Sequence, residues 1–204
     1  MAITNGYATL VEIRARMNIP TADTGSDTML EDTIEAASRA IDGFCARRFY
    51  QVAATARYFT AEDSTWLDVP DLTTLTTLVT DGDGDRTYET TWATTDYDLE
   101  PYNAADVGLP YTSINLAPAG RYGFPTGMAR GVKITGTWGW PSVPDPIREA
   151  CLLQAMRIAK RPSAPFGIDL GGIDQGAAMR IPAIDPDVRM LVAPFRDWNY
   201  VTFE

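Results

Sequence analysis

The sequence predicts an α+β protein, in which helices from the two ends of the chain form a small bundle and a β-rich segment is inserted between them. Near both ends, apolar residues recur every three or four positions, as they do on one face of a helix. From residue 51 to about 140 this period disappears, and Thr, Tyr, Trp and Val become frequent, which is typical of strands. We therefore expect a helical domain of residues 1–50 and 141–204 and a β-rich insertion of residues 51–140.

The composition excludes several classes of function. Of the 204 residues, 45% are hydrophobic, which is enough for a buried core. The 17 Lys and Arg against 27 Asp and Glu give a net charge of −10, which argues against a protein that holds nucleic acid by its phosphates. The chain has no histidine, so Ser–His and Cys–His nucleophilic sites are excluded. We expect no enzymatic activity and no cofactor.

The two cysteines indicate where the protein folds. Cys45 and Cys151 fall in predicted helices, and we interpret both as buried small hydrophobic residues. Two thiols without a histidine cannot complete a zinc site. No segment approaches the ~20 apolar residues of a membrane span, and the N-terminus lacks the pattern of a signal peptide. These observations predict folding in a reducing cytoplasm and no contact with a membrane.

Two helices are predicted before residue 51. Thr9 and Glu12 have the spacing of a capping box, in which each side chain satisfies a backbone donor near the other, and Thr28 and Glu31 repeat it. The second helix has the clearer apolar stripe, formed by Leu30, Ile34, Ala37, Ile41 and Phe44. This stripe predicts that one face of the second helix is part of the core.

The charges of the second helix lie on its other faces. Glu35 and Arg39 are four residues apart and can pair on the surface. Arg47 and Arg48 follow its last turn, where the helix dipole favours positive charge. These charges alone are consistent with an ordinary solvated surface.

The middle segment contains six candidate strands. They span residues 55–60, 65–69, 74–80, 86–92, 96–100 and 131–138. The last alternates cleanly between apolar and polar side chains. The Asp- and Gly-rich residues 81–85 predict a hairpin loop. Residues 108–131 are rich in Gly and Pro and predict a long exposed loop.

Helices return near residue 145. Asp145 is a candidate N-cap, with Pro146 at the first helical position, and the helix is predicted to run to Pro162. Asp185 and Pro186 repeat this pattern before a short helix that ends near Pro194. Residues 162–184 between the two helices predict a flexible link.

Three groups of residues could carry chemistry, and each has a simpler interpretation. Alternating Asp residues from Asp81 could bind calcium, but an EF-hand loop would need Gly at Arg86 and Glu at Trp92, so a solvated hairpin turn is favoured. Asp96, Asp98 and Glu100 could act as carboxylates of a hydrolase, but a charged, solvent-facing strand edge is favoured.

The aromatic residues of the middle segment form the third group. They could line a glycan-binding groove, although packing in a core or against another subunit is favoured. The tryptophans concerned are Trp66, Trp92, Trp138 and Trp140.

Three blocks of sequence resemble the head–tail connector proteins, or adaptors, of tailed bacteriophages. "LVEIRARMNIP" and "DTMLEDTIEAASRAIDGFCARRFY" resemble the start of such proteins, a short helix and then a long helix ending in Arg-Arg-aromatic. "VKITGTWGWPSVPDPIREACLLQAMRIAKR" resembles their strand, Gly-Trp turn and Ala-rich helix, and "DPDVRMLVAPFR" their short closing helix. The blocks occur in family order and cover about half of the chain.

The resemblance implies a structural protein of the virion, at the head–tail junction, that is assembled in the host cytoplasm. It implies a head-to-tail ring of about a dozen copies that binds the portal protein, extends the DNA channel and offers a platform to a stopper or tail protein. Genome DNA would pass through without specific binding. Another virion part, such as a tail-completion protein, and a glycan-binding module are the alternatives.

The resemblance also implies two sets of contact residues. The C-terminal segment would hold the portal, through Leu191, Pro194, Phe195, Trp198 and Tyr200. Contacts between neighbouring copies would involve the outward charges of the long helix, which are Glu35, Arg39, Arg47 and Arg48.

Overall fold

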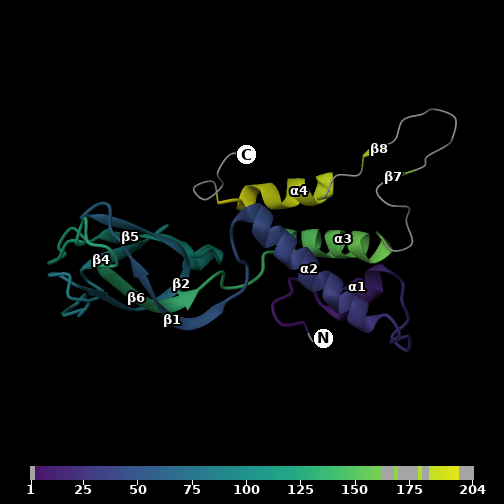
Figure 1. Cartoon of the computed structure of the whole chain (residues 1–204), viewed down its shortest axis with the longest axis horizontal. Coiled ribbons are helices and arrows are strands. Elements are labelled where there is room, and N and C mark those ends of the chain that lie inside the picture. Colours follow the sequence, from purple (N-terminus) through teal and green to yellow (C-terminus); the bar gives the residue numbers. More distant parts are fainter. Residues whose placement is uncertain (1–2, 162–167, 170–178, 181–183, 198–204) are drawn as a thin grey trace. The chain divides into compact units, whose positions relative to one another are not determined.

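The computed structural model describes residues 3–161, 168–169, 179–180 and 184–197 (Figure 1). The chain divides into two compact units, which we call the helical unit (Met1–Arg47 and Val143–Glu204) and the sheet unit (Arg48–Ser142). The predicted α+β class is confirmed. None of the described helices is long and apolar enough to cross a membrane.

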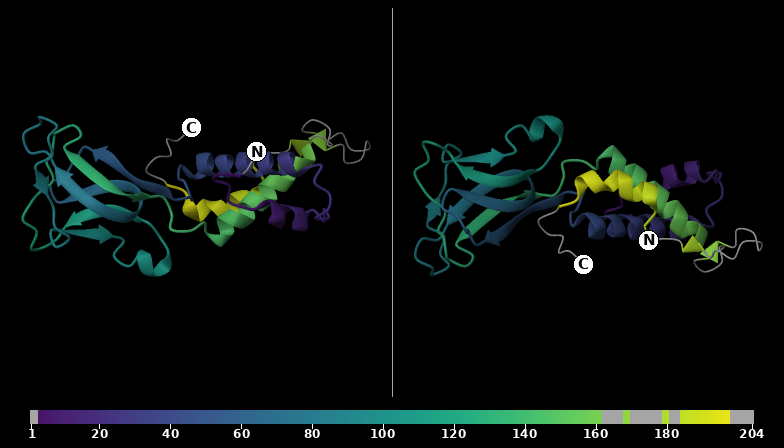
Figure 2. Two further views of the ribbon diagram at one scale, coloured as in Figure 1. Left: turned by 90° about the horizontal axis from the view of Figure 1, so that it is seen from below. Right: turned by 90° about the horizontal axis from the view of Figure 1, so that it is seen from above.

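The helical unit contains four α-helices among its described residues. They are α1 (Leu10–Arg16), α2 (Asp27–Cys45), α3 (Asp145–Lys160) and α4 (Pro186–Val192), and a short 3-10 helix, η3 (Ala193–Phe195), continues α4. Helix α3 packs against both α2 and α4, and α1 contacts α2 and α3 (Figure 2). Two short strands, β7 (Ile168–Asp169) and β8 (Met179–Arg180), pair in antiparallel fashion.

The predicted apolar stripe of α2 is buried in the helical unit, where α2 packs against α3. Leu30, Ile34, Ala37 and Ile41 are all buried, whereas Phe44 is half-buried at the end of the stripe. From α3, the buried apolar residues are Ile147, Ala150, Cys151, Leu152 and Ala155. Both cysteines are free and buried, as predicted.

The helix starts match the sequence predictions in part. The capping box of Thr9 and Glu12 is present at α1. The box predicted at Thr28 is wrong, because α2 begins at Asp27 and its N-cap is Ser26, whose side chain makes no capping hydrogen bond. Asp27 itself places a negative charge in the first turn, where the helix dipole favours it.

The two later helices begin after a proline or an aspartate. Asp145 is the first residue of α3 rather than its N-cap, which is Pro144. Asp185 caps α4 as predicted, because its side chain accepts a hydrogen bond from the backbone N–H of Asp187, and Pro186 occupies the first turn.

The sheet unit is built from six antiparallel strands, among the residues described. Their order is β1-β6-β2-β5-β4, and β3 pairs with β2 beside β5. The strands are β1 (Val52–Phe59), β2 (Trp66–Thr80), β3 (Thr90–Thr91), β4 (Tyr97–Glu100), β5 (Tyr111–Leu116) and β6 (Val132–Trp138). β1 and β4 are therefore the edge strands at the two ends of this order, and β3 is a further edge strand because it pairs only with β2.

Strand β2 unites two strands that the sequence predicts separately. Its first half pairs with β5 and its second half with β6. Pro70 separates the predicted strands, but it lies in the irregular stretch between Asp68 and Leu72, where the pairing with β5 shifts register. Its missing N–H therefore removes no hydrogen bond from a regular ladder.

Strand β5 corrects the prediction of a long loop over residues 108–131. Its central residue, Ile114, is fully buried and lies opposite Leu67 of β2 and Leu99 of β4. β3 is also shorter than predicted, since only Thr90 and Thr91 of residues 86–92 pair with β2.

The core of the sheet unit is centred on aromatic residues. Trp138 is fully buried, and its indole N–H donates a hydrogen bond of 2.9 Å to the backbone carbonyl of Thr55. Trp92 stacks on Phe124, with ring centroids 4.7 Å apart. These contacts tie the strands to the long segment that precedes β6.

Candidate assembly surfaces

The outward charges of α2 bind the N-terminal segment of the same chain. The Glu35 carboxylate accepts hydrogen bonds from the backbone N–H groups of Thr4 and Asn5, at 2.6 and 3.0 Å. The Arg39 guanidinium donates to the Asn5 carbonyl at 2.9 Å and lies 3.3 Å from the Asp42 carboxylate. Two of the predicted inter-subunit residues thus have roles within one copy.

Tyr7 completes this N-terminal clasp, by which we mean the contacts of residues 4–7 with α2. Its backbone N–H donates to the Ser38 hydroxyl at 3.0 Å, and its own hydroxyl donates to the Asp42 carboxylate. The Arg39 guanidinium lies 5.6 Å from the centre of the Tyr7 ring. Only 3% of Tyr7 is exposed, so the clasp covers one side of α2.

The other two predicted inter-subunit residues follow the end of α2. Ala46 ends the helix in the left-handed conformation, with φ of 54°. Arg47 is half-buried in the helical unit, whereas Arg48 is exposed and begins the sheet unit. The charge of Arg48 adds to the effect of burial in lowering the pKa of the Arg57 guanidinium on β1.

The residues predicted to hold the portal lie partly within the described chain. Leu191 and Phe195 are half-buried and Pro194 is exposed, whereas Trp198 and Tyr200 lie outside the described residues. Val188 and Val192 form the buried face of α4. The most exposed apolar side chain of this segment is Met190, at 72% exposure, and the sequence prediction missed it.

The end of this segment is attached to the last turn of α2. The backbone N–H of Asp197 donates to the Cys45 carbonyl at 2.8 Å, and the Cys45 thiol lies 3.7 Å from the Val192 carbonyl. The Arg196 guanidinium lies over the Phe44 ring, 4.7 Å from its centre. The chain therefore leaves the described structure from a fixed position beside the C-terminus of α2.

The environment of Cys45 leaves its thiol unreactive. Burial, together with the negative charge of Asp42, raises the pKa of the Cys45 thiol to about 12. Burial also raises the pKa of the Cys151 thiol, although a hydrogen bond with Ser38 opposes this. Both thiols are consistent with the small-hydrophobe interpretation and with no chemical role.

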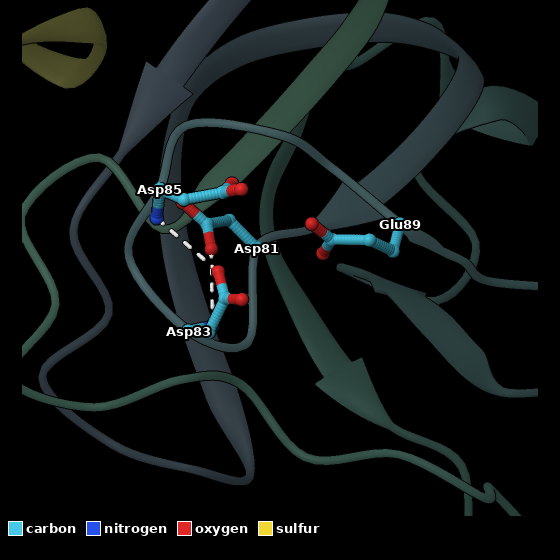
Figure 3. Close-up of side chains that lie close together, drawn as sticks. All are labelled: Asp81, Asp83, Asp85 and Glu89. Carbon is cyan, nitrogen blue, oxygen red and sulfur yellow. Dashed lines mark hydrogen bonds between the residues drawn. The ribbon is translucent and has the colours of Figure 1, made fainter.

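The acidic loop between β2 and β3 is organised by Asp81 (Figure 3). The Asp81 carboxylate accepts hydrogen bonds from the backbone N–H groups of Asp83, Gly84 and Arg86, at 3.1, 2.7 and 2.9 Å. Burial raises the pKa of the Asp81 carboxyl, but these hydrogen bonds outweigh burial and hold the pKa below its usual value.

The same loop brings together four carboxylates that could be ligands of a metal ion. Oxygens of Asp81, Asp83, Asp85 and Glu89 lie within 4.8 Å of one another (Figure 3). The last three side chains are exposed, and Asp81 is already used by the loop backbone. The loop connects two antiparallel strands, as the hairpin prediction requires.

The three carboxylates proposed for a hydrolase do not form one exposed row. Asp96 precedes β4 and is buried, and its carboxylate accepts hydrogen bonds from the backbone N–H groups of Ala93 and Arg121, at 2.8 and 3.3 Å. Asp98 and Glu100 lie on β4, opposite Asn115 and Ser113. The prediction of a shared solvent-facing face is therefore wrong for Asp96, which stabilises a turn.

The tryptophans offer little surface to a glycan. Trp92, Trp138 and Trp140 are each at most 4% exposed, and only Trp66, at 42%, presents a ring to solvent. The interpretation as core residues is therefore confirmed for the first three.

Comparison of the fold with solved structures gives a consistent set of neighbours. No protein-family model matches the chain, and no curated protein matches its sequence. The chain is similar to one in the neck of an empty gene transfer agent (GTA) particle computed with C6 symmetry, with a TM-score of 0.55 and 20% identity. It is also similar to one in the neck of a native GTA particle computed with C12 symmetry, with a TM-score of 0.51 and 21% identity.

A third structure, the virion of a native GTA particle, gives a TM-score of 0.51 and 23% identity. Each match covers 96% of this chain and 92% of the other. The chain has the fold of these neck chains. The resemblance to connector proteins found in the sequence is thus confirmed at the level of the fold, and the match includes the sheet unit, which carries little of that resemblance.

Proposed function

We propose that this chain is a structural virion protein of the neck, a head–tail connector (adaptor) that forms a ring of about a dozen copies beneath the portal. The ring extends the DNA channel and is the docking platform for a stopper or tail protein. The observation that carries this proposal is the shared fold with GTA neck chains over 96% of the chain, one of them in a neck computed with C12 symmetry.

The charge of the chain supports passage of DNA rather than its binding. With a net charge of −10, the chain as a whole repels phosphate groups, which opposes the binding that counterion release would otherwise drive. A channel wall of this kind lets genome DNA pass without specific contacts. In this proposal the protein is assembled in the host cytoplasm and resides at the head–tail junction.

The C-terminal segment is the proposed portal-binding surface. Met190 and Pro194 are exposed and four residues apart, and they adjoin Leu191 and Phe195. Asp197, the residue before Trp198, is hydrogen-bonded to the end of α2. Trp198 and Tyr200 are also candidates for this surface and lie outside the described residues. Exposed apolar side chains beside a fixed attachment are suited to capture by a partner groove.

The helical unit is the proposed ring-forming part, a small bundle of α1 to α4. Arg47 at the end of this part, and Arg48, which begins the sheet unit, are candidate contacts with a neighbouring copy. Glu35 and Arg39 are also candidates, provided that the contact with a neighbour is made in addition to the N-terminal clasp or in place of it.

Electron microscopy of particles with and without the chain tests the proposal. We expect symmetric density for the two units beneath the portal, and particles lacking the chain that fail to retain DNA and to join tails. The variant M190D should reduce attachment to the portal, whereas M29D, at an exposed methionine of α2, should not. Density for the chain at the tail tip, or normal tail joining without the chain, would contradict the proposal. Density for the chain on the tail side of the connector would instead favour a tail-completion protein.

A further inference from the structure

Positive charge in the sheet unit gathers at one edge of the sheet. The unit contains six Lys and Arg, four of which lie at or beside β1: Arg48, Arg57, Arg130 and Lys133. Lys133 lies opposite Tyr58 across the β1–β6 pair, and the Arg130 guanidinium lies 4.5 Å from the Tyr58 ring centre. The Arg57 guanidinium lies 4.2 Å from the Trp138 ring centre. We call these four cations the basic edge.

Negative charge marks the opposite edge. β4 carries Asp98 and Glu100, and the segment that follows carries Asp106, which is exposed. We call these three carboxylates the acidic edge. The sheet order β1-β6-β2-β5-β4 places three strands between the two edges.

These edge charges have no ionic partners among the residues that the structure describes. None of the seven forms an ion pair there, although the helical unit contains several, such as Arg14–Asp27 and Arg16–Glu149. The exposed carboxylates of the acidic loop are also unpaired with the basic edge, even though Tyr88 of that loop lies 5.5 Å from the Lys133 ammonium. Complementary charges are thus kept apart within one copy.

The acidic edge also has exposed apolar residues. Tyr102, Val107 and Leu109, which lie between β4 and β5, are 66%, 68% and 40% exposed. Exposed apolar side chains beside charged ones are typical of surfaces that bind another protein. On the basic edge, Tyr58 is 42% exposed, and Ala53, Ala54 and Ala56 of β1 are exposed as well.

We propose that neighbouring copies contact each other through their sheet units, with the basic edge of one copy against the acidic edge of the next. The proposal rests on the proposed ring function and adds to it the contact surfaces. A head-to-tail ring needs two different, complementary surfaces on each copy. The two edges of this sheet meet that requirement, because they differ in charge and lie at opposite ends of the strand order.

The charges also disfavour the wrong assemblies. A two-fold dimer through β1 would bring eight cations together, and one through β4 would bring six carboxylates together, since each copy contributes its four or three. Like charges in contact are repulsive. Only a basic edge and an acidic edge attract each other. This attraction favours a head-to-tail ring over a two-fold dimer and gives every copy in the ring the same orientation.

Charge reversal with rescue tests the proposal in particles that depend on the chain. The basic-edge variant R48E/R130E and the acidic-edge variant E100K/D106K should each lower incorporation into necks by about tenfold, because each reversal turns two attractions into repulsions. The combination of all four changes should restore incorporation to at least half, because the charges at these four positions are then exchanged between the two edges. R86E/R121E is the matched control, since it changes the other two cations of the sheet unit and should incorporate normally.

Normal incorporation of both edge variants, or a fourfold variant no better than either, would overturn this inference while leaving the connector function intact. Absence of the wild-type chain from necks would instead overturn the proposed function.

Thiol cross-linking provides an independent measurement. In A54C/V107C each edge carries one exposed thiol, whereas the natural Cys45 and Cys151 are buried. A short bis-maleimide should link assembled copies into a ladder of dimers, trimers and larger species, up to a closed ring. A54C alone and V107C alone should yield only monomers. A ladder from either single variant, or none from the double variant in intact necks, would contradict the contact between unlike edges.

Discussion

Replacing Arg14 with Ala is expected to destabilise the helical unit strongly, although Arg14 lies on a short helix near one end of the chain. Its guanidinium donates to the carbonyls of Pro20, Thr21 and Asp23, at 2.7 and 3.1 Å for the first two, and it lies 2.9 Å from the Asp27 carboxylate. One side chain thus joins the loop after α1 to the first turn of α2.

The magnitude follows from what the substitution leaves behind. The Arg14 side chain is only 9% exposed and that of Asp27 24%, so solvent replaces these contacts poorly. Removing one partner of a buried ion pair costs about 3–5 kcal/mol, and the loss of several hydrogen bonds to a charged donor is of similar size. Because the loop carbonyls can be rehydrated, we expect the lower end, about 3 kcal/mol.

Urea unfolding measures the loss, with two probes for the two units. Far-UV circular dichroism reports the helices, and fluorescence reports mainly the sheet unit, which contains four of the five tryptophans. With an m-value of about 1–3 kcal/mol/M, the midpoint of the helix signal should fall by about 1–3 M. R16A is the control, because Arg16 pairs with Glu149 while 41% exposed, and it should cost under about 1 kcal/mol. Equal losses for R14A and R16A would refute the reasoning.

Three further predictions concern single positions. W138A should lower the free energy of unfolding by about 3–5 kcal/mol in the tryptophan-monitored transition, whereas W66A, at a ring 42% exposed, should cost under about 1 kcal/mol. G139A should cost at least about 2 kcal/mol in the same assay, because φ is +96° and the added Cβ would meet a backbone carbonyl, while G82A, with open space around it, should be nearly neutral. The pKa of the Cys45 thiol is about 12 in the folded state and about 9.0 in the unfolded state, so above pH 9 the unfolded state loses this proton first. The contribution of the thiol to the free energy of unfolding should therefore be constant below pH 9 and decline between pH 9 and 12. The variant C45A should lack this decline.

The elements predicted well are those whose signal is local. The stripe of α2 and the alternation in β6 each depend on neighbouring residues, and both appear where expected. β5 was not predicted because it lies between Gly- and Pro-rich segments and has only one fully buried residue, Ile114. Ile114 is buried by contact with β2 and β4, and the local sequence does not indicate this contact. The prediction divided β2 at Pro70 because a proline normally interrupts a strand. Here β2 accommodates Pro70 because the pairing with β5 shifts register around it, and the sequence alone does not show that shift.

The candidate surfaces were less predictable, because they depend on tertiary contacts. The sequence places Glu35 and Arg39 on the outward side of α2 correctly, but it does not indicate that residues 4–7 cover that side. The proximity of Lys133 and Tyr58, which are 75 positions apart, follows only from the register of β1 and β6. The exposed Met190 could have been found, since a helical projection from the buried Val188 and Val192 places it on the opposite face.

The charged residues of the two units differ in how many contacts they make within one copy, and this difference indicates which surfaces join neighbouring copies. In the helical unit, the outward charges of α2 hold the N-terminal clasp, so a neighbour that used Glu35 or Arg39 would have to compete with hydrogen bonds of 2.6–3.0 Å. In the sheet unit, the edge charges form no ion pair among the described residues. Their contacts there are weaker: a 3.4 Å hydrogen bond from the Tyr102 hydroxyl to the Asp98 carboxylate, and aromatic rings beside three of the cations. Association therefore requires less rearrangement at the sheet edges, and within the proposed ring we expect those edges to provide the charged contacts. The helical unit then contributes chiefly through the segment around Met190, which is exposed and apolar and whose attachment to α2 does not depend on a neighbour.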